Sequence, residues 1–147
     1  ENFRKISHYG NIVEEILAGN FEQEDKSSLH QQAKEKLASY FNKNTMEALH
    51  TFYENSATEL TSSIPEEVIP ATYYKKVSDL FVQKDEHLWG EFIETANLLK
   101  IHEQPLKGDT CLINKAVVKT LQNGGAVHVM EKDKMPVDSK IAAFMRY

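Results

Sequence analysis

The side chains that could do chemistry are six histidines, one cysteine and scattered lysines and carboxylates. None of the histidines stands in H-x-x-x-H or H-E-x-x-H spacing, and no group of three or four convergent ligands for a metal can be read from the sequence. No G-x-S-x-G elbow is present, and Cys111 has no persuasive histidine partner. Cys111 stands beside Leu112 and Ile113, which is typical of a small buried side chain in a helix core. We therefore predict no catalytic, cofactor-binding or metal-binding residue.

A glycine pair, Gly124-Gly125, has the composition of a phosphate-binding loop but not its spacing, because G-x-x-x-x-G-K-[ST] is absent. The pair also follows a predicted helix, whereas a phosphate loop precedes one. We interpret Gly124 and Gly125 as structural residues that end the helix.

Three lysines are candidates for contact with RNA or with a partner: Lys115, Lys119 and Lys140. The cluster Tyr73-Tyr74-Lys75-Lys76 combines aromatic and basic residues, but carboxylates flank it. We expect one packed tyrosine and one solvated tyrosine there. Residues 131–140 alternate in charge, which favours a solvated loop.

Composition excludes several classes of protein. The chain has 147 residues, a net charge of −5 and 41% hydrophobic residues, as one soluble globular domain with an appended arm would have. One cysteine cannot form a disulfide framework, and the acidic balance argues against a protein that mainly wraps nucleic acid. We expect no DNA partner, no membrane partner and a cytoplasmic location, because the apolar runs are short and no signal core is visible. The start at Glu1 suggests a piece of a longer protein.

The first half of the chain has helical periodicity. It also carries most of the net charge, because residues 1–76 contain eight basic and twelve acidic residues, a net of −4. We predict a short helix over 11–18 and a long helix from Ser27 or Ser28 to about Ala57. A third helix is predicted over about 64–76, with Ser63 as its cap, Pro65 in its first turn and Glu66 completing a capping box.

The second half alternates between strand and helix patterns. We predict strands at 80–82, 88–93, 98–102 and 126–130 and a central strand at 141–147. Asp109 is the predicted cap of a helix over Thr110–Gln122, whose inner face would hold Leu112, Ile113, Ala116, Val117 and Leu121. The predicted fold class is α/β, with a small mixed sheet sandwiched by helices and an N-terminal helical arm that includes one long helix. The arm would span 1–60 and the α/β domain 61–147.

A series of motifs in the second half resembles a known family. These motifs are Val77–Val82, Gly108-Asp109, Thr120–Gly125, Met135-Pro136 and Ile141–Tyr147. Their order is similar to the C-terminal domain of the bacterial branch of the archaeo-eukaryotic peptide-chain release factor family. Those proteins close with a glycine pair, a strand and a last aliphatic strand that ends in arginine and an aromatic, so Arg146 is a structural candidate. The resemblance is strong for 77–147 and weak for 1–76.

The resemblance implies an α/β third domain related to pelota and to RNA-binding proteins of the kink-turn type. In the wider family, peptide release uses a Gly-Gly-Gln motif in the middle domain. This chain has no Gly-Gly-Gln, because Gly124-Gly125 is followed by Ala126, so no catalytic residue carries over. The resemblance therefore implies a translation-linked, ribosome-associated setting.

Three hypotheses about function follow. The leading one is a non-catalytic interaction domain that binds a protein partner or the ribosome as part of its parent protein. The second is a module that binds structured RNA directly, through a local basic patch near Lys115, Lys119 and Lys140. The third is an enzyme of unknown class, whose support is only that α/β domains have crevices between their loops.

Overall fold

A computed structural model describes residues 25–147, apart from the side chains of Ser39 and Phe41. The helix predicted over 11–18 lies outside the described residues. By its contacts the chain divides into two compact units, Glu1–Asn44 and Thr45–Tyr147. The division into an arm of 1–60 and a domain of 61–147 stays a prediction. We call the second unit, Thr45–Tyr147, the C-terminal unit.

The long helix predicted in the first half is present as α2, Lys26–Glu54. It begins at Lys26, so Ser27 and Ser28 lie inside its first turn, and the predicted cap at either serine is wrong. Its last ten residues belong to the C-terminal unit, where Ala48 and Phe52 are buried.

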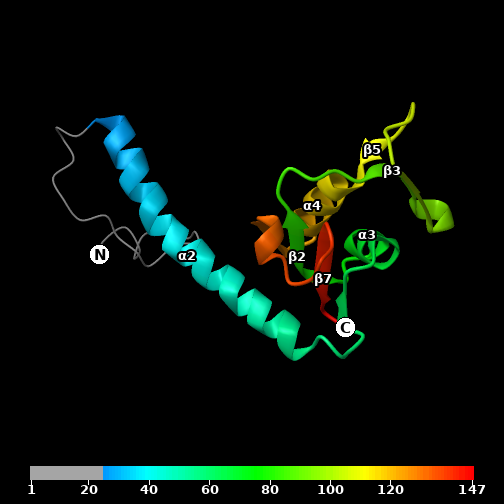
Figure 1. Ribbon diagram of the computed structural model, residues 1–147, viewed down its shortest axis with the longest axis horizontal. Helices are drawn as coiled ribbons and strands as arrows, with labels where there is room; N and C mark the ends of the chain where they lie inside the picture. The colour runs from blue at the N-terminus through cyan, green and yellow to red at the C-terminus, as the bar shows by residue number, and fades with distance from the viewer. Residues whose placement is uncertain (1–24) are drawn as a thin grey trace, which may run out of the picture. The chain divides into compact units, whose positions relative to one another are not determined.

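A four-stranded mixed sheet forms the centre of the C-terminal unit. It contains β1 (Thr61–Ser62), β2 (Val77–Gln83), β6 (Ala126–Met130) and β7 (Ile141–Met145), in the order β1-β7-β2-β6. β2 pairs in parallel with β6 and antiparallel with β7, so β2 and β7 are the central strands (Figure 1). This confirms the central position predicted for the last strand, and its continuous apolar sequence suits burial on both faces.

Helices cover both faces of this sheet. α3 (Pro65–Tyr73) and α4 (Leu112–Gln122) pack on the face that carries Leu80 and Ile141. On the other face, the end of α2 places Phe52 against Phe81. Because neighbouring residues of a strand point to opposite faces, β2 needs apolar residues at successive positions to fill both layers. Leu80, Phe81 and Val82 meet that requirement.

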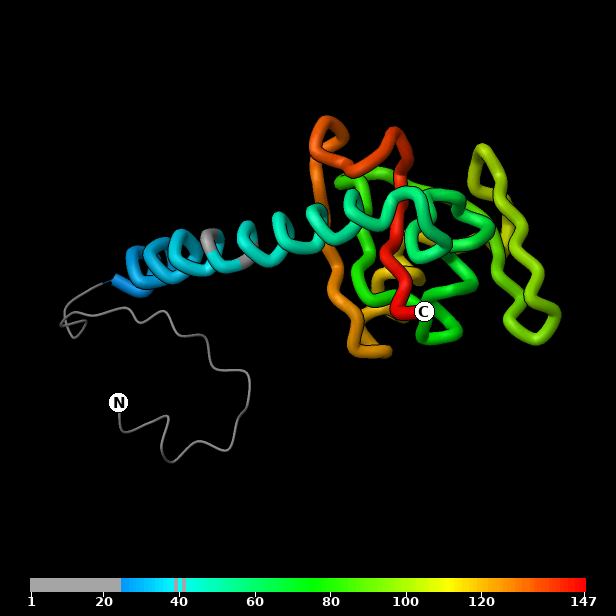
Figure 2. Tube along the Cα trace, turned by 90° about the horizontal axis from the view of Figure 1, so that it is seen from below, coloured from blue at the N-terminus to red at the C-terminus, as the bar shows by residue number. Residues whose placement is uncertain are grey.

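The remaining strands form a separate three-stranded antiparallel sheet, where the prediction had only one sheet. It contains β3 (Trp89–Ile93), β4 (Leu98–His102) and β5 (Thr110–Cys111), in the order β4-β3-β5. Figure 2 shows the β3–β4 hairpin, in yellow-green, standing off from the rest of the C-terminal unit. Gly90 permits the close pairing, because a Cβ at this position would lie 1.9 Å from the backbone oxygen of Lys100.

Both predicted helix caps in the C-terminal unit are wrong. α3 begins after Ile64, with Pro65 in its first turn, and Ser63 does not cap it by a side-chain hydrogen bond. α4 begins after Cys111 and not at Thr110, and Asp109 does not cap it. For α4 the reason is tertiary, because Thr110 and Cys111, which were expected to be helical, pair with β3 as β5 before the helix begins.

The predictions for Leu121 and Cys111, both expected on the core side of the helix, are wrong. Leu112, Ile113 and Ala116 are buried, as predicted, but Leu121 is 57% exposed. Cys111 is only partly buried and lies at the end of β5, before the helix, where it packs at the margin of the core.

The connection between α4 and β6 requires glycine at positions 124 and 125. Gly124 has φ +72°, a left-handed conformation that glycine adopts without strain, and the residue ends the helix. A Cβ on Gly125 would lie 2.7 Å from Cγ2 of Thr120 and 3.0 Å from two backbone oxygens of β2. Arg146 donates a hydrogen bond from Nη2 to the carbonyl of Asn123, 2.9 Å away, which places a positive charge at the carboxyl end of α4.

Candidate protein-interaction site

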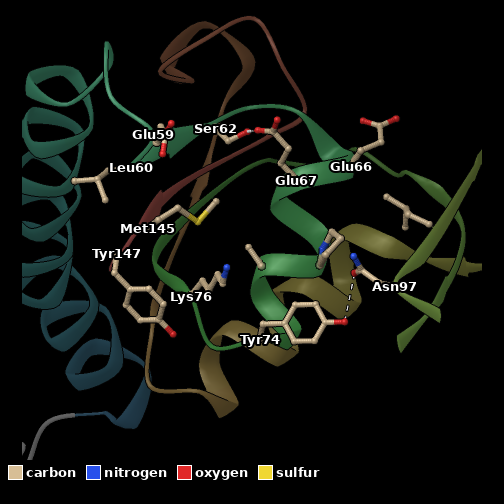
Figure 3. A pocket seen from close by; sticks show the side chains of 13 residues that line it. Glu59, Leu60, Ser62, Glu66, Glu67, Tyr74, Lys76, Asn97, Met145 and Tyr147 are labelled. Atoms are coloured by element: carbon tan, nitrogen blue, oxygen red, sulfur yellow. Dashed lines mark hydrogen bonds between the residues drawn. The ribbon is translucent and has the colours of Figure 1, made fainter. Parts of the chain in front are cut away.

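An open pocket of about 690 Å³ lies beside α3 and β1 (Figure 3). The chain that enters β1, the first two turns of α3, the loop after the 3₁₀ turn Glu94–Ala96 and the end of β7 all contribute to its wall. Its polar lining residues are Glu59, Ser62, Glu66, Glu67, Tyr74, Lys76, Asn97 and Tyr147. The pocket is therefore assembled from segments that are far apart in the sequence.

The pocket lining has a net negative charge. It contains three carboxylates, those of Glu59, Glu66 and Glu67, and one ammonium group, that of Lys76. Within residues 25–147, Glu59, Glu66 and Lys76 make no side-chain hydrogen bond or ion pair. These two carboxylates are thus available to a positively charged ligand.

Two hydrogen-bonded pairs fix opposite sides of the pocket. Ser62 Oγ donates to Oε2 of Glu67 at 2.5 Å and accepts the N–H of Ile64 at 3.2 Å, which holds the third carboxylate beside β1. On the other side, Tyr74 Oη donates to Oδ1 of Asn97 at 3.3 Å (Figure 3). Asn97 has φ 47° at the end of the 3₁₀ turn, so the hairpin loop presents its side chain toward α3.

No motif in the sequence predicts this pocket. The pair Glu66-Glu67 is favoured in the first turn of a helix by the helix dipole, and that explanation needs no ligand. The pocket that this pair lines together with Glu59 and the end of β7 is formed with the antiparallel pairing of Ser62 with Ala143, which joins β1 to β7. No local pattern marks that pairing, since β1 has only two residues. The tyrosine expectation is confirmed: Tyr73 is partly buried against Phe92, and Tyr74 is exposed.

The three lysines predicted for RNA or partner contact occupy different settings. Lys115 is exposed on α4, whereas Lys119 lies one turn further along, with Nζ 4.9 Å from the centre of the Tyr73 ring. Lys140 precedes β7 and forms an ion pair with Glu86 at 2.7 Å. The hydrogen bond from Lys140 and its charge hold the pKa of the Glu86 carboxyl below its ordinary value. Two of the three cations are thus already paired within the protein.

The fold brings together three polar side chains, those of His128, Asp79 and Thr45, whose types also occur in catalytic sites. Nε2 of His128 lies 3.1 Å from Oδ1 of Asp79, and its Nδ1 lies 3.0 Å from Oγ1 of Thr45. Burial by itself raises the pKa of Asp79, but the hydrogen bonds from His128 and Ser78 outweigh it, and the pKa is lowered. His128 is only 7% exposed and stacks on Phe81. The arrangement joins the end of α2 to β6 and β2, and we assign it a structural role.

Two other histidines have polar partners near the hairpin. Nδ1 of His102 lies 2.8 Å from Oδ2 of Asp109, which also accepts the N–H of Leu106. These two hydrogen bonds, the backbone one first, lower the pKa of Asp109. Sγ of Cys111 lies 3.5 Å from Nδ1 of His87, a contact that the sequence did not predict.

Two further kinds of site have no candidate in the described part of the chain. Residues 25–147 hold no group of three or more His, Cys, Asp or Glu side chains placed to bind a metal ion. Over the same residues, no helix combines the length and apolarity that a membrane span requires.

Comparison with solved structures identifies the fold. The C-terminal domain of a peptide-chain release factor from Methanosarcina mazei superposes with a TM-score of 0.59 at 15% identity, over 85% of this chain and 97% of that one. Pelota from Archaeoglobus fulgidus gives 0.48 at 16% identity, and an archaeal translation termination factor gives 0.42 at 14%. The alignment with pelota covers 90% of this chain and 38% of pelota. The alignment with the termination factor covers 71% of this chain and 25% of that factor. The first of these likenesses shows that the fold is that of a release-factor C-terminal domain.

The sequence itself gives the family. Residues 1–76 match the profile of bacterial archaeo-eukaryotic release factor family 3, and the chain belongs to that family. The match lies in the half where the sequence analysis found the weaker resemblance, while the structural likeness extends over most of the chain. No curated protein matches the sequence.

Proposed function

We propose that the C-terminal unit is a non-catalytic protein-interaction domain of a cytoplasmic, translation-associated protein, and that it binds a basic side chain of its partner in the acidic pocket. The observation that carries the proposal is the pair of unpartnered carboxylates, Glu59 and Glu66, in an open pocket of about 690 Å³. An acidic lining attracts Lys or Arg and repels the phosphates of RNA. Membership of a release-factor family supports the translation setting and a partner on or near the ribosome.

The geometry also suits a flat cationic group. Tyr74 is 42% exposed and Tyr147 is 74% exposed, and both line the pocket together with the carboxylates. A guanidinium group can stack on a tyrosine ring while it donates hydrogen bonds to a carboxylate. We therefore expect arginine to bind better than lysine, because its planar guanidinium can stack flat on the ring and bond a carboxylate through two N–H groups at the same time.

The test uses the 147-residue chain and short peptides that carry a single arginine, lysine or norleucine at a central position. Nuclear magnetic resonance titration should show peptide-dependent shifts around Glu59, Glu66 and Tyr74 for arginine, smaller shifts for lysine and none for norleucine. The double variant Glu59→Gln/Glu66→Gln should weaken arginine binding at least about tenfold, the loss of about 1.4 kcal/mol. Glu91→Gln, an exposed carboxylate on β3 outside the pocket, is the matched control.

RNA binding through Lys115, Lys119 and Lys140 remains the alternative, and a gel-shift assay with a kink-turn RNA at low salt tests it. We expect no shift. A salt-sensitive shift that Lys115→Glu abolishes, together with arginine peptides that leave the pocket resonances unchanged, would replace the protein-interaction proposal by the RNA one.

A further inference from the structure

The pocket beside α3 and β1 contains one positive charge as well as three negative ones. The ammonium group of Lys76 lines it, and within residues 25–147 this side chain makes no hydrogen bond or ion pair. Figure 3 shows the three carboxylates along one side of the pocket and Lys76 on the other, with Met145 between them. An ammonium group whose only role was to neutralise the lining is expected to pair with one of these carboxylates, but Lys76 pairs with none of them. It is therefore available to an anion.

The position of Lys76 is fixed through its backbone. α3 ends in a turn in which Lys75 has φ 61°, and the N–H of Lys76 donates to the carbonyl of Ala71 at 3.0 Å. This is the hydrogen bond that closes a helix in the Schellman arrangement. The carbonyl of Lys76 accepts the N–H of Arg146 at 2.7 Å, which ties the turn to the chain just after β7. Because both backbone groups are bonded, a ligand has to order only the side chain of Lys76.

We propose that the pocket recognises an arginine of the partner together with a neighbouring carboxylate, which pairs with Lys76. The inference rests on the proposed function, because the guanidinium group still binds Glu59 and Glu66. A cation alone would gain those two contacts but would be repelled by the ammonium group of Lys76. A segment that offers both charges complements all three side chains. Lys76 is then a specificity-determining residue of the site.

The apolar part of the wall suits such a ligand. Met145 is 8% exposed and Ala71 is 7% exposed, and both line the pocket. The methylene stem of an arginine can cover this apolar surface while its guanidinium group reaches the carboxylates. The carboxylate of the ligand can belong to an acidic side chain next to the arginine or to the C-terminus of the partner. Both sources offer the same group to Lys76, and suitable peptides distinguish them.

Nuclear magnetic resonance titration of the 147-residue chain with two pairs of acetylated peptides tests the proposal. The first pair has amidated ends and differs only in Arg-Gln against Arg-Glu. The second pair ends in arginine, either amidated or with a free carboxylate. In at least one pair, the peptide with the carboxylate should bind about threefold more tightly or better, and that pair identifies the source.

Two lysine variants assign the preference to one side chain. Lys76→Gln should remove the preference for the carboxylate, and its affinity for the Arg-Gln peptide should be unchanged or higher, because a repulsive charge is gone. Lys75→Gln is the matched control, since Lys75 is exposed in the same turn but does not line the pocket. It should keep the preference. Circular dichroism establishes that each variant is folded.

The outcomes separate this inference from the proposed function. If the Arg-Gln peptide binds and Glu59→Gln/Glu66→Gln weakens it, but neither carboxylate improves binding, the proposed function stands and the role of Lys76 is overturned. A preference that persists in Lys76→Gln, or one that is also lost in Lys75→Gln, overturns that role as well. If no arginine peptide binds, the proposed function and this inference both fail.

Discussion

The two sheets of the C-terminal unit differ in how they are covered. In the four-stranded sheet, Leu80 and Phe81 of β2 are fully buried because helices pack on both faces. In the three-stranded sheet, Leu98 of β4 is 45% exposed, and β4 contains no fully buried residue. We infer that the two sheets contribute very differently to stability, because apolar burial and not the ladder alone supplies most of the free energy.

Each sheet also contains a histidine–aspartate pair. His128 is 7% exposed and its pair with Asp79 connects three elements, whereas His102 is 33% exposed and bonds Asp109 only seven residues away. The first pair fixes the packing of a helix on a sheet, and the second fixes a local loop. We therefore expect changes at the first pair to affect the whole unit and changes at the second to stay local.

The largest effect is expected from Phe81→Ala. Its ring packs edge-to-face on Phe52 at 5.5 Å and stacks on His128 at 5.1 Å, so truncation removes contacts on both sides and leaves a cavity. We expect a loss of about 3–5 kcal/mol in the free energy of unfolding, measured by urea denaturation. Leu98→Ala in the other sheet should cost about 0.5 kcal/mol or less. Equal losses at the two positions would contradict the comparison.

The next effect is expected from His128→Ala. The substitution removes the stacked ring and leaves Asp79 and Thr45 without their partner, so we expect a loss of about 2–4 kcal/mol. Thr45→Val removes a single hydroxyl and should cost about 1 kcal/mol. His102→Ala is the counterpart in the hairpin and should change global stability less than either. If His128→Ala costs no more than His102→Ala, the pair does not couple the elements as we infer.

A local effect is expected from Gly90→Ala. The added Cβ would lie 1.9 Å from the backbone oxygen of Lys100, so β3 and β4 must separate at this point. We expect a cost of about 1–3 kcal/mol, with faster hydrogen exchange confined to β3 and β4. Glu91→Ala, at an exposed neighbouring position, serves as the control. Exchange that accelerates equally in β2 and β7 would mean that the two sheets unfold together.

The smallest effect is a dependence on pH at Asp79. Its pKa in the folded protein lies below the ordinary value of 3.8, so the stability it contributes is complete above that value and is lost as the pH falls through the lowered pKa. Wild-type stability should therefore decrease between about pH 5 and about pH 2, and Asp79→Asn should show a smaller decrease. Asp138→Asn, in the loop before β7, should follow the wild-type curve. A parallel decrease in Asp79→Asn would assign the acid sensitivity to other carboxyl groups.

Most elements could be predicted because their signals are local. The strands Leu98–His102 and Ala126–Met130 agree with the prediction to the residue, since apolar residues alternate there between clear turn signals. The helix stop at Gly124 was also predictable, because a left-handed φ at the end of a helix favours glycine. The helix starts were not predictable, because Ser63 and Asp109 have the right chemistry for caps but do not act as caps. Asp109 bonds His102 and the N–H of Leu106 instead, and Ser63 makes no side-chain bond to α3.

The candidate site was much less predictable than the fold. Glu66, Glu67 and Tyr74 were noticed for their types, but their spacing is explained by a helix start and a packed aromatic pair. The sequence could not show that Glu59 lines the same pocket, because the wall also includes the end of β7, which pairs with β1 across about 80 residues. Lys119 and Lys140 contact Tyr73 and Glu86 within the protein, and the contact of the three lysines with RNA or a partner stays a prediction.

By itself the sequence determined the alternation of helices and strands, the long helix, the structural role of the glycine pair and the family. These follow from side-chain periodicity and backbone conformational preference, which act over a few residues. Only the tertiary structure decided that the strands form two sheets, that carboxylates from separate segments line one pocket, and that β6 is the last strand of its sheet within residues 25–147. These three features depend on which distant segments pack together. The hydrophobic effect is non-directional, so the pattern of one strand does not specify the strand with which it pairs.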